Sequence, residues 1–206
     1  MMNALIEMLI SYFGLALVAA GAQNAVFTRA LGISSGLRML HDSKKSTGYF
    51  CAALTVFQLM TVIIVYFAMP LFDVAGFGAY RRFVLPAIVV AACTISYLAV
   101  IMVLSIVMGR NFKNVVRSVT SASINSAIVG TVILTVYQGL KLGESIAFAL
   151  GSSIGYFIAI TLISEGERKI AHDRVPEAFR GLPITLIYIS ILALGIYGLI
   201  GHMIAF

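Results

Sequence analysis

Two polar interruptions stand inside long apolar segments of this chain, one in each half, and their oxygens could coordinate a small cation. Gln23 and Asn24 form the first interruption, and Asn125 and Ser126 form the core of the second. Hard cations take amide and hydroxyl oxygens as ligands. We therefore expect these four residues to line a path for Na⁺ or H⁺. The alternative is that the side chains only satisfy a helix break or bond a neighbouring helix.

Other chemistry is not indicated by the sequence. It has no P-loop, no Ser-His-Asp set and no paired carboxylates within an apolar segment, so we expect no catalytic residue in this chain. Cys51 and Cys93 lack CxxC spacing, and they are expected at different depths, too far apart for a disulfide or a shared metal site. His41 and His172 lie in separate loops without ligand spacing, so no metal site is predicted.

The elements that must position these residues are membrane helices. Hydrophobic residues make up 61% of the chain, charged residues 11%, and the mean hydropathy is +1.03, whereas a soluble domain has about 25% charged residues. Charge-free stretches run over 8–28, 46–72, 83–109, 118–140, 145–164 and 181–206. Each can supply the ~20 residues that a helix needs to cross a bilayer. Because these runs lack the alternation of barrel strands, we predict an all-α polytopic membrane protein with six transmembrane helices.

The six spans fall into two sets of three. Because three is an odd number, the second set of helices enters the membrane from the opposite side to the first. Residues 1–109 and 110–206 are therefore predicted to be inverted three-helix repeats of a single membrane domain. In such a fold the two polar interruptions lie near the midplane of the bilayer. Eleven of the fourteen lysines and arginines follow the first, third and fifth spans. The positive-inside rule places those loops in the cytoplasm and both termini outside. The net charge of +6 therefore indicates orientation in the lipid bilayer and not nucleic acid binding.

Small residues and prolines mark where the helices should end or pack. The first span is expected to continue to about Leu31 and to break at Gly32, and the second to stop at Pro70. The N-terminal stretch has no basic region or cleavage site and is interpreted as part of the first span. Small residues at intervals of three or four in the last two spans favour close packing, inside the chain or against a partner. They are Ala147, Gly151 and Gly155, then Gly195, Gly198 and Gly201.

Several short motifs follow one another along the chain. They are Gln-Asn-Ala-Val at 23–26 with Leu-Gly-Ile at 31–33, Ser-Lys-Lys at 43–45, Asn-Ser-Ala-Ile-Val-Gly at 125–130, Gly-Ser-Ser-Ile-Gly-Tyr at 151–156, and Glu-Arg at 167–168 with 173–181. In this order they resemble the membrane subunits of the Rnf and Nqr redox-driven ion pumps, specifically the A subunit of Rnf and the E subunit of Nqr. The resemblance covers most of the chain.

The resemblance implies a member of an electron-transfer complex that translocates ions across a bacterial cytoplasmic (inner) membrane. It implies as partners a homologous six-helix subunit of opposite topology and other subunits of the complex, which hold flavins and iron–sulfur centres. This chain would serve as scaffold and ion path. Two alternatives stay open: a small secondary transporter of the same inverted-repeat fold without redox chemistry, and a purely structural assembly subunit.

The resemblance also implies where iron would be ligated. In the family, cysteines from the first and fourth spans hold an iron centre at the interface of two homologous subunits, and the flanking residues place those positions at Ser34 and Ser126. A serine hydroxyl stays protonated and binds iron far more weakly than the thiolates that hold iron–sulfur clusters. This chain is therefore expected to bind no cluster or other cofactor itself.

A dense charged segment follows the fifth span. Four of its residues, Glu167, Arg168, Asp173 and Arg180, are candidates for docking to a cytoplasmic redox subunit. The alternative is a solvated loop, which is the usual role of a run of mixed charges.

Overall fold

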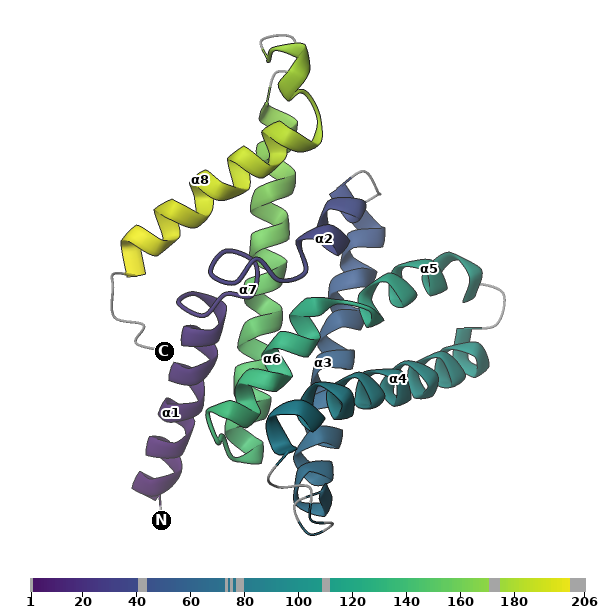
Figure 1. Cartoon of the computed structure of the whole chain (residues 1–206), viewed down its shortest axis with the longest axis vertical. Helices are drawn as coiled ribbons and strands as arrows, with labels where there is room; N and C mark the ends of the chain where they lie inside the picture. Colours follow the sequence, from purple (N-terminus) through teal and green to yellow (C-terminus); the bar gives the residue numbers. More distant parts are fainter. Residues whose placement is uncertain are drawn as a thin grey trace.

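The computed structural model shows a helical protein (Figure 1). It describes residues 2–40, 44–72, 74, 76, 80–108, 112–170 and 175–200. The helices are α1 (Met2–Ala20), α2 (Ile33–Leu40), α3 (Lys44–Phe72), α4 (Arg81–Met108), α5 (Phe112–Ser123), α6 (Ser126–Tyr137), α7 (Leu142–Lys169) and α8 (Leu182–Ile200), with a 3₁₀ turn at Glu177–Phe179. No strand occurs in these ranges, so the prediction of an all-α protein is confirmed.

Four helices of the described chain, α3, α4, α7 and α8, are long and apolar enough to cross a membrane. Helices α5 and α6 together make a fifth candidate span, which is bent by 42° where they meet. Helix α1 has 19 residues, or about 28 Å at 1.5 Å per residue, close to the ~30 Å of a hydrocarbon core. The protein is therefore a polytopic helical membrane protein with four or five candidate spans in the described ranges.

Helix α7 lies at the centre, because 56% of its apolar stretch is buried. Helix α8 is peripheral, because only 11% of its apolar stretch is buried. Helix α1 packs along α7 (Figure 1) and runs parallel to it, because Ala16 meets Gly151 and Ala20 meets Gly155. A Cβ atom at Gly155 would lie 2.5 Å from the carbonyl oxygen of Ala20. The predicted close packing in the fifth span is therefore confirmed, and its partner is α1 of the same chain.

The glycines of the last span behave differently. A Cβ atom on Gly195 or Gly198 of α8 would meet no atom within 4 Å, and Gly201 lies outside the described residues. The two described glycines therefore do not pack against any other described part of the chain.

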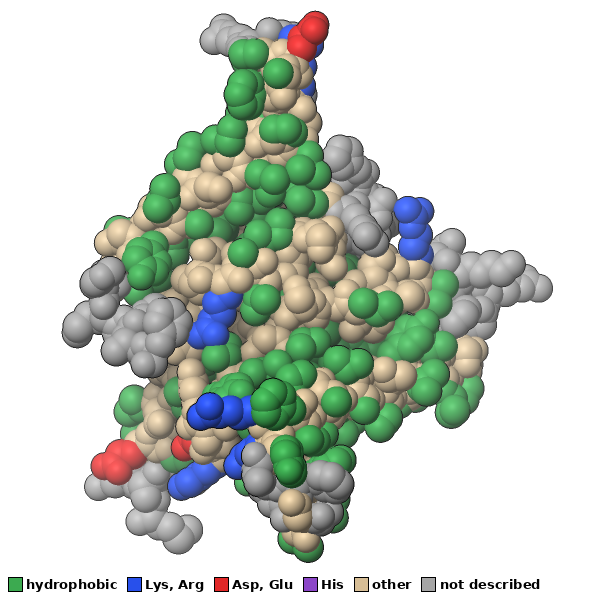
Figure 2. Space-filling view, in the orientation of Figure 1, with side chains coloured by type: hydrophobic (Ala, Val, Ile, Leu, Met, Phe, Trp, Pro, Cys, Tyr) green, Lys and Arg blue, Asp and Glu red, His purple; other side chains and the backbone are tan. Residues whose placement is uncertain are grey.

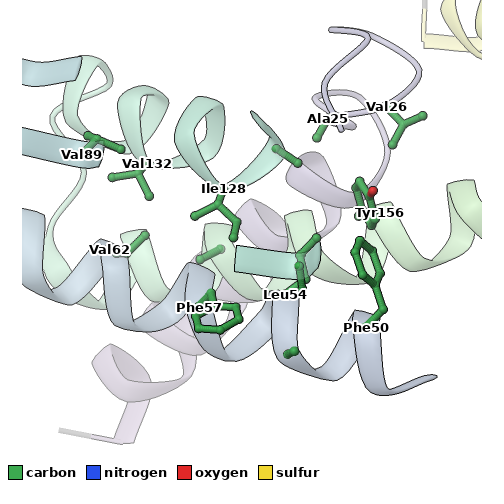
Figure 3. Packing of buried hydrophobic residues seen from close by; sticks show 14 of the residues in the cluster. Ala25, Val26, Phe50, Leu54, Phe57, Val62, Val89, Ile128, Val132 and Tyr156 are labelled. Atoms are coloured by element: carbon green, nitrogen blue, oxygen red, sulfur yellow. The ribbon is translucent and has the colours of Figure 1, made fainter. Parts of the chain in front are cut away.

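Residues of α3, α4, α5, α6, α7 and α8 and of the turn after α1 form the hydrophobic core, part of which Figure 3 shows. Phe50, Leu54 and Phe57 of α3 are each at most 1% exposed, and Figure 3 shows the ring of Phe50 against that of Tyr156 of α7. The rings of Phe50 and Tyr156 are 6.1 Å apart between centroids, within the range of favourable aromatic pairs. This packing holds α3 against α7.

Two predicted helix ends were wrong. The first helix ends at Ala20 and not near Leu31, because the chain turns through residues 21–32 before α2 begins. Pro70 does not end the second span, since α3 continues to Phe72 with this proline inside its last turn. A proline there removes a single backbone hydrogen bond, which a helix end can tolerate.

Candidate functional site

Asn24 organises the turn that follows α1. Its Oδ1 accepts hydrogen bonds from the backbone N–H groups of Val26 at 2.9 Å and Phe27 at 3.3 Å. Its Nδ2 donates to the carbonyl oxygens of Ala20 at 2.8 Å and Gly155 at 2.9 Å. The residue is 3% exposed, and these four bonds use the two donors and two lone pairs of its carboxamide. Asn24 therefore ends α1 and ties the turn to α7.

Asn125 has the corresponding role at the bend between α5 and α6. It is the N-cap of α6, and its Oδ1 accepts a hydrogen bond from the backbone N–H of Ala127 at 2.9 Å. Its Nδ2 donates to the hydroxyl of Tyr156 at 3.2 Å. Each asparagine thus accepts from the N–H two positions later and donates to α7, at the adjacent residues Gly155 and Tyr156.

The two breaks meet at Gly32. Its N–H donates to Ser126 Oγ at 2.8 Å, and its carbonyl oxygen accepts from the Tyr156 hydroxyl at 2.8 Å. Gly32 has a φ of +75°, and a Cβ atom there would lie 2.6 Å from Asn125 Oδ1. A left-handed backbone and this close approach both require glycine. The structure thus brings Asn125 and Ser126 into contact with the turn that Asn24 organises.

Gln23 lies apart from this contact. Its Oε1 accepts a hydrogen bond from Gln138 Nε2 at 3.1 Å, and this bond is exposed. Gln138 follows the last residue of α6, whereas Ser126 is the first, so the twelve residues of α6 separate the two positions by about 18 Å. Of the four predicted ion-path residues, Gln23 alone faces the far end of α6.

A cavity of about 540 Å³ opens beside the second break. Its lining combines hydroxyl and amide groups with one thiol, and includes Ser34, Cys93, Tyr97, Thr120, Asn125 and Ser126. The two serines that the resemblance singled out therefore share one cavity. Cys93, on α4, lines the same cavity. No spacing in the sequence indicates this, since the contact is entirely tertiary.

The donor set of this cavity does not fit an iron–sulfur cluster held by this chain. Such clusters are ligated by several thiolates, and the cavity offers one thiol, Cys93. Ser126 already accepts a hydrogen bond from Gly32. Within the described part of the chain, no three His, Cys, Asp or Glu residues converge on a possible metal position.

The described docking candidates are each held by a bond within the chain. Glu167 accepts a hydrogen bond from Thr185 of α8 at 3.2 Å, and Arg180 Nε donates to the carbonyl oxygen of Val175 at 2.9 Å. Arg168 forms an exposed ion pair with Glu165 at 3.2 Å. Asp173, like His41 and His172, lies outside the described residues. The described candidates of this segment are therefore bonded within the chain, and the Arg168–Glu165 pair is exposed at the surface.

The helices and this site define a class: a polytopic helical membrane protein in which a bent helix and a turn meet against a central helix. The model of the family described as "Rnf-Nqr subunit, membrane protein" matches residues 12–203. The chain belongs to the Rnf-Nqr family, as the motifs predicted.

Individual relatives match over shorter stretches. The chain is 37% identical over 73 residues to the E subunit of the Na(+)-translocating NADH-quinone reductase of Pseudoalteromonas translucida, which covers 35% of this chain and 36% of the relative. It is 36% identical over 77 residues to the A subunit of the ion-translocating oxidoreductase complex of Syntrophotalea carbinolica, which covers 37% and 40%. The chain thus spans about 36–40% of the length of these two curated relatives.

Proposed function

We propose that this protein is an integral subunit of an electron-transfer complex that couples redox chemistry to the translocation of Na⁺ or H⁺. The observation that carries this proposal is the family match over residues 12–203. Relatives named as subunits of a Na(+)-translocating reductase and of an ion-translocating oxidoreductase complex support it. The membrane is the bacterial cytoplasmic (inner) membrane, and the chain alone is not the catalyst.

In this proposal the chain crosses the membrane six times, as inverted repeats 1–109 and 110–206. The order of elements supports this, because each half has an interrupted segment followed by two long helices: α1 and α2 before α3 and α4, then α5 and α6 before α7 and α8. The parallel course of α1 and α7 agrees with their places as the first and fifth spans. Both termini lie outside, and the charged connections lie in the cytoplasm.

The ion path runs beside the two breaks. Asn125 and Ser126 line the cavity and offer oxygen ligands there, as does Ser34. Asn24, whose carboxamide is fully bonded within the chain, holds the first break in position. Gln23 contributes at the other end of α6, where it meets Gln138.

The redox cofactors belong to partner subunits. The cavity offers a single thiol among hydroxyl and amide groups, which supports the proposal that this chain ligates no iron–sulfur cluster. A homologous six-helix subunit of opposite topology completes the membrane core, and flavins and iron–sulfur centres reside in other subunits. Glu167, Arg168, Asp173 and Arg180 present the charges for a cytoplasmic partner.

Extraction in a mild detergent tests the proposal. A tagged copy should co-purify with flavin- and iron-bearing subunits, and mass and metal analysis should assign the iron to them. Purification of this chain alone, or as a homodimer without redox subunits, would contradict the proposal. That outcome would favour a small secondary transporter, for which the cavity beside the second break is the candidate substrate site.

A further inference from the structure

A group of buried polar side chains crosses the core between α3, α6 and α7, separate from the contact at Gly32. Its members are Gln58, Thr131, Ser152 and Ser153, each 4% exposed or less. The Ser153 hydroxyl donates to Gln58 Oε1 at 2.9 Å. The Thr131 and Ser152 hydroxyls are also 2.9 Å apart. Polar side chains are costly inside a membrane protein unless they are bonded or serve a ligand, so each member needs a reason.

Gln58 is the member whose hydrogen bonds are incomplete. It is 1% exposed, and its Nε2 makes no hydrogen bond to any described residue. A buried amide without a partner is strongly disfavoured. Because an amide can rotate by 180°, its nitrogen and oxygen can exchange places. Nε2 then donates to Ser153, and Oε1 becomes a free oxygen ligand in the core.

The polar group lies between two cavities. The first, of about 540 Å³, includes Cys93, whose Sγ is 3.8 Å from the hydroxyl of Thr61, one turn beyond Gln58 on α3. The second, of about 330 Å³, lies at the other end of α6 and includes Thr135, one turn beyond Thr131. None of the four residues is in the lining of either cavity, but Thr61 and Thr135 continue the polar group toward one cavity each.

We propose that Gln58, Thr131, Ser152 and Ser153 form a binding site for a sodium-sized monovalent cation between the two cavities. This inference rests on the proposed function, because an ion that is translocated needs such a site within the membrane. The four side chains offer neutral oxygens, which suit a hard monovalent cation. None is a carboxylate or histidine of the kind that relays protons, and none supplies the carboxylates that Ca²⁺ or Mg²⁺ takes.

The test measures sodium binding by the purified full-length chain. Thermal unfolding in mild detergent is compared in NaCl and in choline chloride at equal ionic strength, since a ligand that binds only the folded protein raises Tm with its concentration. At a hundred times Kd the rise should be about 5 °C or more. Gln58→Leu and Thr131→Val should each lose the sodium-specific part of this rise.

Thr55→Val is the matched control. The Thr55 hydroxyl bonds the carbonyl oxygen of Cys51 at 3.0 Å, just as that of Thr131 bonds the carbonyl oxygen of Ala127 at 2.8 Å, but Thr55 lies outside the polar group. This variant should keep the sodium response. Equal Tm values of the wild type in both salts would overturn the inference, as would an undiminished response in both site variants. Purification of this chain without redox subunits would contradict the proposed function and not this inference. Even then, a sodium response of the wild type that both site variants lose would support the sodium site.

Discussion

Asn24 and Asn125 illustrate how one residue type ends a membrane helix without exposing backbone to lipid. In each case the side-chain oxygen accepts from an N–H two positions later, and the side-chain nitrogen donates to α7. Lipid offers no hydrogen bonds, so an interrupted helix must find its partners within the protein. The sequence located these residues as polar interruptions, because a carboxamide in an apolar run is conspicuous.

Other site residues were less visible in the sequence. Gly32 was predicted only to break a helix, whereas it bonds both Ser126 and Tyr156. Tyr156 belongs to a motif that indicated the family but carried no role of its own. Gln58 and Cys93 gave no signal of function, because a single glutamine or cysteine within an apolar helix is usually part of the packing.

At the residue scale, we predict that Gly32→Ala destabilises the protein by about 2–4 kcal/mol. A positive φ disfavours any Cβ by about 1–2 kcal/mol, and here the Cβ would also lie 2.6 Å from Asn125 Oδ1 and from Tyr156 Cε2, an overpacking that adds a similar amount. Thermal or denaturant unfolding in detergent measures the loss.

Gly181→Ala is its control. Gly181 has a φ of +79°, but a Cβ atom there would meet no atom within 4 Å, so this substitution introduces backbone strain alone. It should cost less than Gly32→Ala. An equal loss of unfolding free energy in both variants would show that the close contact at Gly32 contributes nothing to the destabilisation.

At the scale of elements, apolar runs predicted the long helices, but the end of the first helix could not be predicted from the sequence. The first span ends at Ala20 because Asn24 reaches Gly155, which is 131 positions later in the chain. No local pattern contains that partner. The small residues of α7, by contrast, indicated close packing correctly, since their spacing is local, although the sequence could not name α1 as the helix that packs there.

Glycine substitutions on α7 and α8 should have effects of opposite sign. A Cβ at Gly151 would collide with the backbone of Ala16, so Gly151→Ala should cost about 1–3 kcal/mol through overpacking. Gly195 of α8 meets nothing within 4 Å, so Gly195→Ala should stabilise by about 0.5–1 kcal/mol through helix propensity alone. Unfolding of the two variants in the same detergent checks both signs. A neutral Gly151→Ala would contradict the close packing of α1 on α7.

At the scale of the whole molecule, composition predicted a polytopic helical membrane protein, because 61% hydrophobic residues in long charge-free runs suit lipid and not water. Figure 2 shows apolar side chains spread over the surface of α4 and α8. Exposed members include Val103 and Ile106 of α4 and Ile191 and Leu194 of α8. Lipid or partner subunits must cover such a surface. The bend between α5 and α6 and the peripheral position of α8 depend on long-range packing, which cannot be predicted from composition.

Orientation in the membrane can be checked with single cysteines at the two ends of α7. In a background with Cys51 and Cys93 replaced by serine, Glu144→Cys should react with an impermeant maleimide added outside cells. Arg168→Cys should react only after the membrane is permeabilised, because the positive-inside rule places that end in the cytoplasm. The reverse pattern would invert the proposed topology.

The hydroxyl of Tyr156 is one oxygen atom shared by both halves of the chain. It donates to Gly32 in the N-terminal half and accepts from Asn125 in the C-terminal half. The Tyr156 hydroxyl therefore joins the two interrupted segments directly. Neither interrupted segment can move along α7 unless it breaks its hydrogen bond to that oxygen or the other interrupted segment moves with it.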